Sequence, residues 1–525
     1  MAIVRKVLVV GGGTAGWLTA TYLARALGAA KSGGVVVELV ESPDISIVGV
    51  GEGTFPSIRG TLSAIGLDEN KFIARANATF KQGIRFEHWA RPPGAPGRDH
   101  YLHPFSAPSQ RPGAPELLPY WLLGYAPKEL AFAEAVTMQK RVTDAGRGPK
   151  RLSDGPWQAP LNHAYHFDAA RFADALSEHG QRELGVVRRA ATIERVELDQ
   201  TGAIACVHTR EQGALSADLY IDCTGFRSLL CGQALGVGWR SAKDVLFNDR
   251  AWAMQVPYER KDTPIPSFTI ARAHEAGWTW DIGLHERRGV GYVFSSRHTD
   301  ETRAEQVLRG YLGKSADGLT AKLIKFEAGH RTEPWRKNCV AVGLAGGFVE
   351  PLESTGIALI EIAAYLIAHL FPSDGDMAPV AKTFNAMMAA RYARIFDFIK
   401  LHYCLSQRRD TPFWIDNADA ASIPQTLQDK LAMWRCRPPH RLDFISDLEM
   451  FLPASWQYVL YGMEFRTDLS AMRGVYDQGE SARREFAAVQ HVAGLAVDDL
   501  PAHRALVEAM ARDYETQRDR IPQTA

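Results

Sequence analysis

Several residues in this sequence are of types that could carry out chemistry. Gly11, Gly13 and Gly16 form the pattern Gly-x-Gly-x-x-Gly, Lys81 lies in an alternating apolar stretch, and Glu353 precedes an apolar run. A glycine turn lets backbone N–H groups approach a pyrophosphate. A lysine can donate a proton or act as an amine, and a carboxylate can accept a proton. The sequence thus offers a dinucleotide site and a possible acid–base pair.

The glycine turn has the flanking elements that a dinucleotide site requires. The apolar run 6–10 predicts a strand before it, residues 17–26 have helical spacing, and a second strand at 35–40 leads to Glu41. Thr14 and Ala15 complete the turn, and Glu41 is placed to bind a ribose, although the linker 29–34 makes the spacing longer than the usual ~20 residues. The alternative is a tight strand–helix turn with a solvated glutamate.

The glycine turn does not distinguish FAD from NAD. Two later apolar strands, within 217–226 and 338–347, also run into turns of small residues. Distant strand ends of this kind favour a long, extended dinucleotide such as FAD.

Lys81 and Glu353 each have a simpler interpretation. Phe80 and Ile84 alternate with Lys81 and Arg85, so the pattern alone favours a solvated cation on the polar face of one strand. Glu353 precedes the candidate caps Ser354 and Thr355, which excludes a capping box but allows a carboxylate that favours the helix dipole.

The stretch Gly277–Gly283, GWTWDIG, places two tryptophans on the same face of a predicted strand. Buried indoles need a partner for the N–H group. By pattern alone, a strand with two core aromatics is the simpler interpretation.

Composition limits the class of protein. The 525 residues carry 60 basic and 60 acidic side chains, so the charge gives no reason to expect nucleic acid or an anionic membrane as a partner. The six cysteines have no metal-ligand spacing, which favours reduced thiols over disulfides and predicts no metal site. No signal peptide is apparent, and the apolar run 356–371 is too short to span a bilayer, so we expect a cytoplasmic protein.

The order of elements predicts an α/β fold. We expect a structured loop or lid in the Pro/Gly-rich stretch 90–120, another irregular stretch at 145–160, and a helix at 169–184. Strands are expected within 185–222 and 278–296, and mainly helices after residue 372, with a frayed final dozen residues. We divide the chain into a core, 1–375, and a helical C-terminal subdomain, 376–525.

Together these motifs resemble the flavin-dependent tryptophan halogenase family. The resemblance is collinear from residue 3 to about 465 and is carried by the following stretches: GGGTAGW at 11–17, GVGEGT at 49–54, FKQGIRF at 80–86, IDCTGFR at 221–227 and GFVEPLESTGI at 347–357. GWTWDIG lies where the family has Trp-x-Trp-x-Ile-Pro, with Gly283 in place of proline. Gly283 could add local backbone freedom and mark a subgroup with a different substrate range.

The resemblance implies an FAD-binding Rossmann-like core of the glutathione-reductase or monooxygenase type. It implies reduced FAD from a separate NAD(P)H flavin reductase, O₂, and chloride or bromide, which together produce hypohalous acid. This oxidant would travel to Lys81 and Glu353, where an aromatic substrate is halogenated. Further roles are implied by position: Thr355 and Gly356 for the halide, Leu344 and Ile357 for the flavin, a structural role for Glu350, and Trp278, Trp280 and Ile282 for the partition.

The substrate is less determined. His103 and Phe105 align with a pair that flanks the indole ring in tryptophan-using members, but buried loop aromatics are an equal alternative. The segment 440–448 lacks the tyrosine pair that binds the charged backbone of tryptophan in the family. We therefore predict a small neutral aromatic substrate, indole-like or phenolic, and a monomer or homodimer. A flavin-dependent hydroxylase and a non-catalytic flavin-binding protein are the alternatives.

Overall fold

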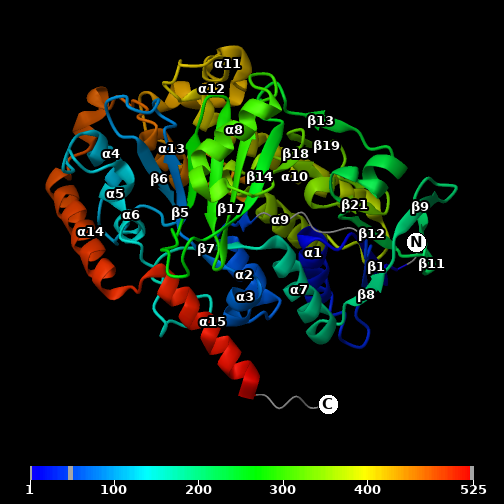
Figure 1. Ribbon diagram of the computed structural model, residues 1–525. Helices are drawn as coiled ribbons and strands as arrows, with labels where there is room; N and C mark the ends of the chain where they lie inside the picture. The colour runs from blue at the N-terminus through cyan, green and yellow to red at the C-terminus, as the bar shows by residue number, and fades with distance from the viewer. Residues whose placement is uncertain (1–2, 45–50, 521–525) are drawn as a thin grey trace.

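A mostly parallel sheet forms the nucleotide-binding part of the fold (Figure 1). The structure is a computed structural model that describes residues 3–44 and 51–520. The strand order is β20 (Trp335–Arg336), β21 (Cys339–Ala341), β12 (Leu219–Asp222), β1 (Lys6–Val10), β2 (Val36–Glu41) and β8 (Val187–Ala190). The apolar strands β1 and β2 are buried on both faces, as parallel strands in such sheets are. This is the Rossmann-like core expected from the glycine turn.

Different layers cover the two faces of this sheet. On one side lie α1 (Thr14–Ala26), α7 (Ala169–Glu183) and α9 (Thr355–His369), and both α7 and α9 pack against α1. On the other side, Leu8 and Val10 share a core cluster with a small antiparallel sheet. Its strands are β9 (Ile193–Leu198), β10 (Ile204–Thr209) and β11 (Gly213–Leu215).

A seven-stranded sheet carries the tryptophan pair. Its order is β18 (Lys322–Lys325), β14 (Arg250–Pro257), β17 (Arg287–Phe294), β16 (Gly277–Gly283), β15 (Thr269–Ala273), β5 (Gly83–Glu87) and β6 (His100–Pro104). One face packs against α8 (Glu301–Leu312) through Tyr292 and its neighbours. Trp278, Trp280 and Ile282 are on the other face and belong to the main core. This alternation follows from the two-residue period of a strand.

The sequence suggested a single strand around Lys81, but the structure has two separate strands there. It breaks at Gln82, whose N–H donates a hydrogen bond to the carbonyl oxygen of Ser267 at 2.6 Å. Before the break, β4 (Thr79–Lys81) pairs with β7 (Ala164–Phe167) in a separate sheet that also includes β3 (Glu52–Gly53). After it, β5 belongs to the seven-stranded sheet. The two halves of the alternating pattern thus face different surroundings.

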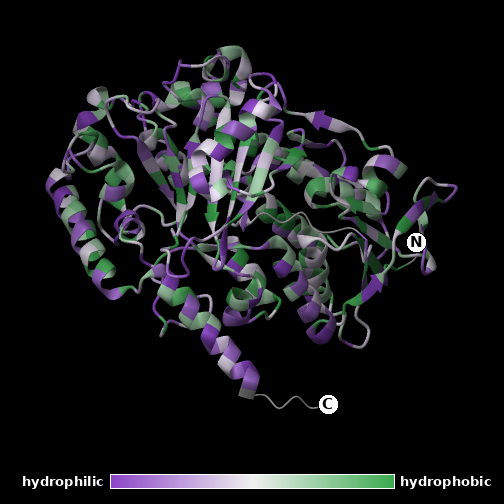
Figure 2. Cartoon of the chain, viewed as in Figure 1, coloured by the Kyte–Doolittle hydropathy of each residue, from purple (hydrophilic) through white to green (hydrophobic). Residues whose placement is uncertain are grey.

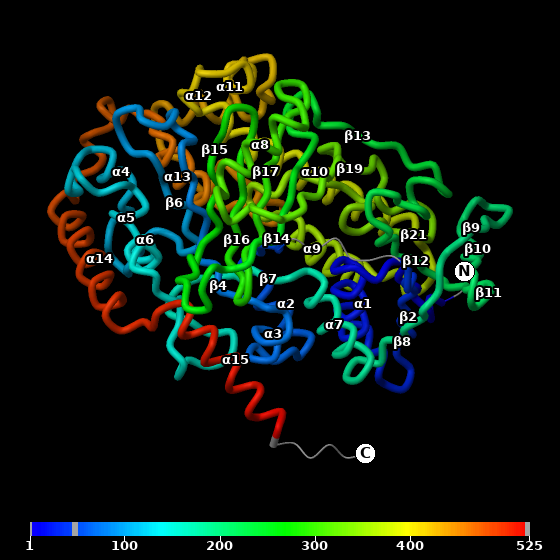
Figure 3. Tube along the Cα trace, in the orientation of Figure 1, coloured from blue at the N-terminus to red at the C-terminus, as the bar shows by residue number. Residues whose placement is uncertain are grey.

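After residue 375 the described part of the chain consists mainly of helices joined by irregular segments, as predicted. The longer helices are α10 (Met377–Cys404), α11 (Pro412–Ala418), α12 (Gln425–Trp434), α13 (Pro453–Gly462), α14 (Gly479–Asp499) and α15 (His503–Arg520). Figures 1 and 3 show α14 beside α4 (Leu117–Leu122), α5 (Phe132–Val136) and α6 (Gln139–Asp144), and α15 beside α3 (Glu69–Arg75). The expectation of a frayed final dozen was wrong for its first part, since α15 continues to Arg520. Figure 2 shows that this projecting end is mostly hydrophilic.

The Pro/Gly-rich stretch 90–120 is more regular than expected. It contains β6, an edge strand of the seven-stranded sheet, and the start of α4. Prolines surround this strand, and a proline cannot donate the backbone hydrogen bonds that join neighbouring strands. An edge strand needs such donors on one side only, so an edge position suits it.

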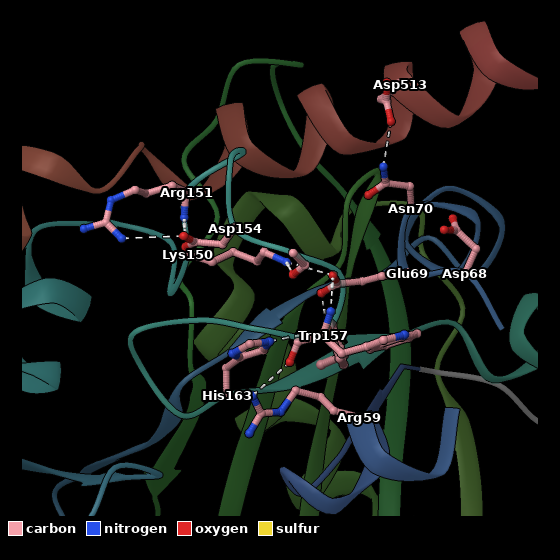
Figure 4. A network of polar contacts seen from close by, with 12 residues as sticks. Arg59, Asp68, Glu69, Asn70, Lys150, Arg151, Asp154, Trp157, His163 and Asp513 are labelled. Atoms are coloured by element: carbon pink, nitrogen blue, oxygen red, sulfur yellow. Dashed lines mark hydrogen bonds and ion pairs between the residues drawn. The ribbon is translucent and has the colours of Figure 1, made fainter. Parts of the chain in front are cut away.

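The stretch 145–160 is irregular, as predicted, and a buried ion pair holds it in place (Figure 4). Lys150 Nζ lies 2.8 Å from Glu69 Oε2, and both side chains are 2% exposed. Glu69 also accepts a hydrogen bond from the backbone N–H of Trp157 at 2.7 Å. The loop is therefore fixed to α3.

Other predicted elements are confirmed. The helix expected at 169–184 is α7, the strands expected within 185–222 and 278–296 are present, and the apolar run 356–371 forms α9. All six cysteines are free thiols. Within residues 3–44 and 51–520, no helix is both long enough and apolar enough to cross a membrane.

Candidate active site

A cavity of about 1430 Å³ extends from the glycine turn to the start of α9. The sequence-predicted residues that line it are Gly11, Gly13, Thr14, Ala15, Glu41, Trp280, Ile282, Leu344, Gly356 and Ile357. Glu52 and the strand end Cys223–Phe226 line it as well. The long shape joins the two strand ends that favoured FAD over a shorter ligand.

The glycine turn fits a pyrophosphate. A Cβ atom at Gly11, whose φ is +113°, would lie 2.3 Å from the carbonyl oxygen of Cys223, and one at Gly16 would lie 1.7 Å from the carbonyl oxygen of Gly11. A Cβ at Gly13 would meet no atom within 4 Å, so the turn is open on its cavity side. α1 begins there without a side-chain cap, which leaves its first N–H groups available for an anion.

Glu41 lies at the end of β2 and is held in place. Its Oε2 accepts a hydrogen bond from Trp17 Nε1 at 3.3 Å, and its Oε1 pairs with Arg188. The carboxylate therefore faces the cavity beside the turn, where it could accept hydrogen bonds from ribose hydroxyls.

Lys81 is fully buried, so the solvated-cation interpretation was wrong. Its Nζ donates hydrogen bonds to Ser354 Oγ at 2.7 Å and to the carbonyl oxygen of Thr54 at 3.3 Å. Nζ also lies 5.2 Å from the centre of the Phe105 ring. Burial lowers the pKa of Lys81 to about 7, although the nearby Glu353 charge acts in the opposite direction. Near neutral pH, both protonation states of the amine are accessible.

Glu353 is also fully buried and lies between two histidines. His103 Nδ1 is 2.9 Å and 3.1 Å from its two oxygens, and His402 Nε2 is 2.8 Å from Oε1. Burial alone would raise the pKa of Glu353, but the charge and hydrogen bond of His103, with those of His402, lower it to about 2. Glu353 is thus an ionised carboxylate held beside the lysine.

His402 is a site residue that the sequence did not reveal. Its Nδ1 faces the carbonyl oxygen of Phe398 at 2.9 Å, while its Nε2 faces Glu353. Both ring nitrogens therefore face an oxygen atom, and the ring joins Glu353 to the backbone of α10. His402 lies in the last turn of the long helix α10, where a single histidine in the sequence gives no functional signal.

The first residues of α9 connect Lys81 with the cavity. Ser354 has φ +57° in the left-handed region and uses its hydroxyl to accept the lysine hydrogen bond rather than to cap the helix. Thr355 is buried, and its Oγ1 has no partner among the described residues. Gly356 lines the cavity. A helix start with free N–H groups and an available hydroxyl is a suitable anion site.

The two tryptophans do not have equivalent positions. Trp280 lines the cavity with Ile282, whereas Trp278 is fully buried behind it, with the ring centres 6.4 Å apart and the planes at 61°. Trp280 pairs with Gly291, where a Cβ atom would lie 2.2 Å from the indole ring. The missing side chain at Gly291 provides the space that Trp280 occupies.

Gly283 continues β16 and pairs with Arg288. Its φ is outside the left-handed region, so the conformation does not need the backbone freedom we had expected from glycine. A Cβ atom there would lie 2.8 Å from Ile265 Cγ2 and 3.1 Å from the Tyr258 hydroxyl. Close packing is therefore the local reason for a small residue.

A cluster of aromatic side chains that do not line the cavity lies near Lys81 and His103. Phe55 lies 6.0 Å from Phe105 and 5.3 Å from Phe451 between ring centres. Phe451 stacks on Phe398 at 3.8 Å, and His103 lies 6.0 Å from Phe398. His103 is on β6 rather than in a loop, and Phe105 follows directly. The predicted site residues thus come together, except that Gly49 and Val50 of the GVGEGT motif lie outside the described residues.

Comparison with known proteins identifies the family. The model of the family described as tryptophan halogenase matches residues 6–475. The chain belongs to the tryptophan halogenase family. It is 36% identical to tryptophan 6-halogenase SttH of Streptomyces toxytricini over 97% of this chain and 98% of that protein. It is also 36% identical to tryptophan 7-halogenase RebH of Lentzea aerocolonigenes, over 82% of each chain.

Solved structures of halogenases agree with this assignment. The crystal structure of a tryptophan halogenase from Shewanella frigidimarina superimposes with a TM-score of 0.91 at 40% identity, covering 97% of this chain and 98% of that one. BrvH, a flavin-dependent halogenase from Brevundimonas, gives 0.86 at 33% identity, covering 97% and 99%. The chain is therefore an enzyme, a flavin-dependent halogenase of the oxidoreductase class, and its family implies FAD and a halide.

Proposed function

We propose that this enzyme halogenates a small neutral aromatic compound with hypohalous acid made at the flavin and used at Lys81 and Glu353. The observation that carries the proposal is the burial of Lys81 beside Glu353, with Ser354 joining the lysine to the start of α9. Trp280 lines the cavity, whereas Lys81 and Glu353 are fully buried and are not among its lining residues. Oxidant formation and ring chemistry would therefore take place in separate compartments.

The residues of the cavity have distinct proposed roles. The glycine turn and Glu41 would hold the pyrophosphate and ribose of FAD, and Leu344 and Ile357 would contact the ring system. Thr355 and Gly356 would bind the halide at the start of α9. Bound reduced FAD, together with O₂, would supply the oxidising equivalents that convert the halide to hypohalous acid.

At the second site, Lys81 would donate a hydrogen bond to the oxygen of hypohalous acid and so polarise its oxygen–halogen bond. The substrate ring carbon then attacks the halogen, forming a carbon–halogen bond as the oxygen leaves as water after protonation. The ionised Glu353 stabilises the cationic ring and accepts the ring proton. In the alternative sequence, neutral Lys81 first takes the halogen as a haloamine and releases water.

The surroundings support a neutral substrate. Two charged side chains near the aromatic cluster are already paired, Lys430 with Asp397 at 3.2 Å and Arg394 with Glu449 at 2.7 Å. Free tryptophan would bring an ammonium and a carboxylate that need partners of their own. Although the relatives named above are tryptophan halogenases, we propose an indole-like or phenolic substrate here. Turnover of free tryptophan well above that of indole would contradict this choice.

Mass spectrometry of products from an aromatic panel tests the function directly. The assay contains a flavin reductase, NADH, O₂ and either chloride or bromide, because we propose that a separate reductase supplies reduced FAD. Hydroxylated product in the absence of halide would instead favour a hydroxylase.

Lys81→Ala is the decisive variant. It should reduce halogenation by on the order of a hundredfold or more while flavin oxidation continues, because the donor beside the oxidant is lost. Lys382→Ala, in the exposed part of α10, is the matched control and should behave as wild type. Continued halogenation by the Lys81 variant would defeat the assignment.

A further inference from the structure

A second buried glutamate, Glu350, lies close to the site and has no part in the proposed reaction. Its side chain is 1% exposed. Its Oε2 accepts hydrogen bonds from Trp278 Nε1 at 2.9 Å, Asn248 Nδ2 at 2.7 Å and the Tyr403 hydroxyl at 2.8 Å. These donors come from β16, from the segment before β14 and from α10. Burying a carboxylate without such donors would be costly, so the three contacts act together.

Glu350 and Glu353 both anchor the short segment 350–353 to α10. Tyr403 donates to Glu350, and the preceding residue on α10, His402, contacts Glu353. Between the glutamates, Pro351 begins a single 3₁₀ turn. Consecutive residues of one helix thus hold both carboxylates, which links the position of Trp278 to that of Glu353.

The indole of Trp278 has a single polar group, and Glu350 is its acceptor. Trp278 lies directly behind Trp280, the tryptophan that lines the flavin cavity. The terminal side-chain torsion of a tryptophan can adopt a broad range of angles. Packing together with a hydrogen bond therefore restrains the indole ring more than packing alone. Loss of the acceptor would let the supporting ring move and weaken the wall between the two compartments.

We propose that Glu350 is a positioning residue that fixes Trp278 and thereby keeps hypohalous acid on its route to Lys81. The inference rests on the proposed function, since it concerns the escape of the oxidant that the function requires. In this proposal Glu350 keeps the oxidant from escaping, whereas Glu353 takes part in halogenation of the ring.

The test measures the fraction of oxidant that leaves the enzyme. Hypohalous acid released during turnover is trapped by a small halogen acceptor in solution and expressed per flavin oxidised, beside the yield of halogenated substrate. Glu350→Leu and Trp278→Phe each remove one partner of the hydrogen bond, and each should raise the released fraction about fivefold. The double variant should release no more than the worse single variant, because the two changes break the same contact.

Glu350→Gln is the conservative variant. Neither Glu350 Oε1 nor Asn248 Oδ1 has a partner among the described residues, so a glutamine can keep an acceptor for Trp278 and add a donor. We expect its released fraction to stay within about a factor of two of wild type. Trp335→Phe is the matched control, since it removes a buried indole hydrogen bond, to the carbonyl oxygen of Lys337, on β20.

The outcomes separate this inference from the function. An unchanged released fraction in folded, FAD-binding Glu350→Leu overturns the inference. If that variant does not fold, an unchanged fraction in Trp278→Phe overturns it. If wild type gives neither halogenated product nor trapped hypohalous acid with any halide, the proposed function itself fails.

Discussion

Lys81 and Glu353 are buried groups near one another, and their surroundings lower the pKa of both. Burial lowers the pKa of Lys81 to about 7, and the histidine contacts lower that of Glu353 to about 2. The carboxylate is therefore ionised at any working pH, whereas the lysine changes its charge near neutrality. The pH dependence of halogen transfer should follow Lys81.

We expect the ratio of halogenated product to flavin oxidised to fall as the pH rises through about 7. Above this value the ammonium becomes a neutral amine and is a weaker donor to the oxidant. Product yield measured from acidic to basic pH tests this. Lys81→Arg keeps its charge, so any residual activity should lack the decline. A yield that rises through the same range would instead indicate the haloamine route.

His402→Gln should slow halogenation about tenfold or more without changing flavin oxidation. Glutamine can still contact Glu353 but lacks the rigid ring that also reaches the carbonyl oxygen of Phe398. Single-turnover product formation measures the effect. His491→Gln, on the exposed face of α14, should match wild type. Equal rates for both variants would show that the imidazole ring of His402 is not needed.

Only part of this site could be predicted from the sequence. The glycine turn was recognisable because its requirements are local, and family resemblance pointed to Lys81 and Glu353. His402 and Ser354 were missed because their roles depend on long-range contacts: 49 residues separate His402 from Glu353, and 273 separate Ser354 from Lys81. Hydrophobic periodicity carries no information about such pairings.

Among the helices, α9 is attached to α2 (Ser57–Ala64) by a buried carboxyl group. Glu361 accepts hydrogen bonds from Thr61 at 2.6 Å and Ser57 at 3.1 Å. Burial raises the pKa of Glu361 to about 7. α2 follows β3, which belongs to the same small sheet as the strand of Lys81. The contact therefore connects the region of this sheet with α9, which begins at Thr355.

Glu361→Gln should stabilise the enzyme at basic pH and change little at acidic pH. A carboxyl with a raised pKa stabilises the fold fully below its usual value of 4.5, and this contribution is lost progressively as the pH rises from there through about 7. Glutamine resembles the protonated form at every pH. The gain at pH 8.5 should be on the order of 1–3 kcal/mol in the free energy of unfolding.

Urea unfolding at pH 5.5 and at pH 8.5 measures the difference. Glu480→Gln is the control, because the Glu480 side chain is 77% exposed, and it should give the same small effect at both values. A Glu361 variant that is destabilised equally at both pH values would contradict the expected titration.

The positions of helices and strands were easier to predict than the way the strands pair with one another. α7 and the strands of the nucleotide-binding sheet follow from local patterns, whereas the break at Gln82 does not, because it arises from a hydrogen bond to Ser267. Similarly, β6 forms in a Pro/Gly-rich stretch because β5 offers it an edge. Tertiary pairing overrode local composition in both cases.

Over the whole molecule, the end of the chain returns to the strand of Lys81. His503, at the start of α15, accepts a hydrogen bond from the backbone N–H of Phe80 at 3.0 Å and donates one to the carbonyl oxygen of Ile265 at 2.9 Å. Burial lowers the pKa of His503 to about 4, which keeps it neutral as this arrangement requires. The residue lies beyond residues 6–475, the part of the chain that the family model matches.

His503→Ala should lower the free energy of unfolding by on the order of 2 kcal/mol and reduce halogenation, because two buried backbone groups lose their partner. His503→Gln can both accept and donate, so it should recover much of each loss. Thermal unfolding and product yield measure the two effects. His491→Ala, on the exposed face of α14, controls for loss of a histidine. A fully active His503→Ala enzyme would show that β4 does not need this contact.

The position of His503 also determines how the protein can be joined to another one. α15 continues past this histidine and its hydrophilic end projects away from the body of the enzyme (Figures 1 and 2). A reductase fused after Arg520 would leave the contact between His503 and Phe80 intact. A protein shortened to residues 6–475, the part that the family model matches, would lose this contact. Fusion at this end is therefore a practical route to a self-sufficient biocatalyst, and shortening there is not.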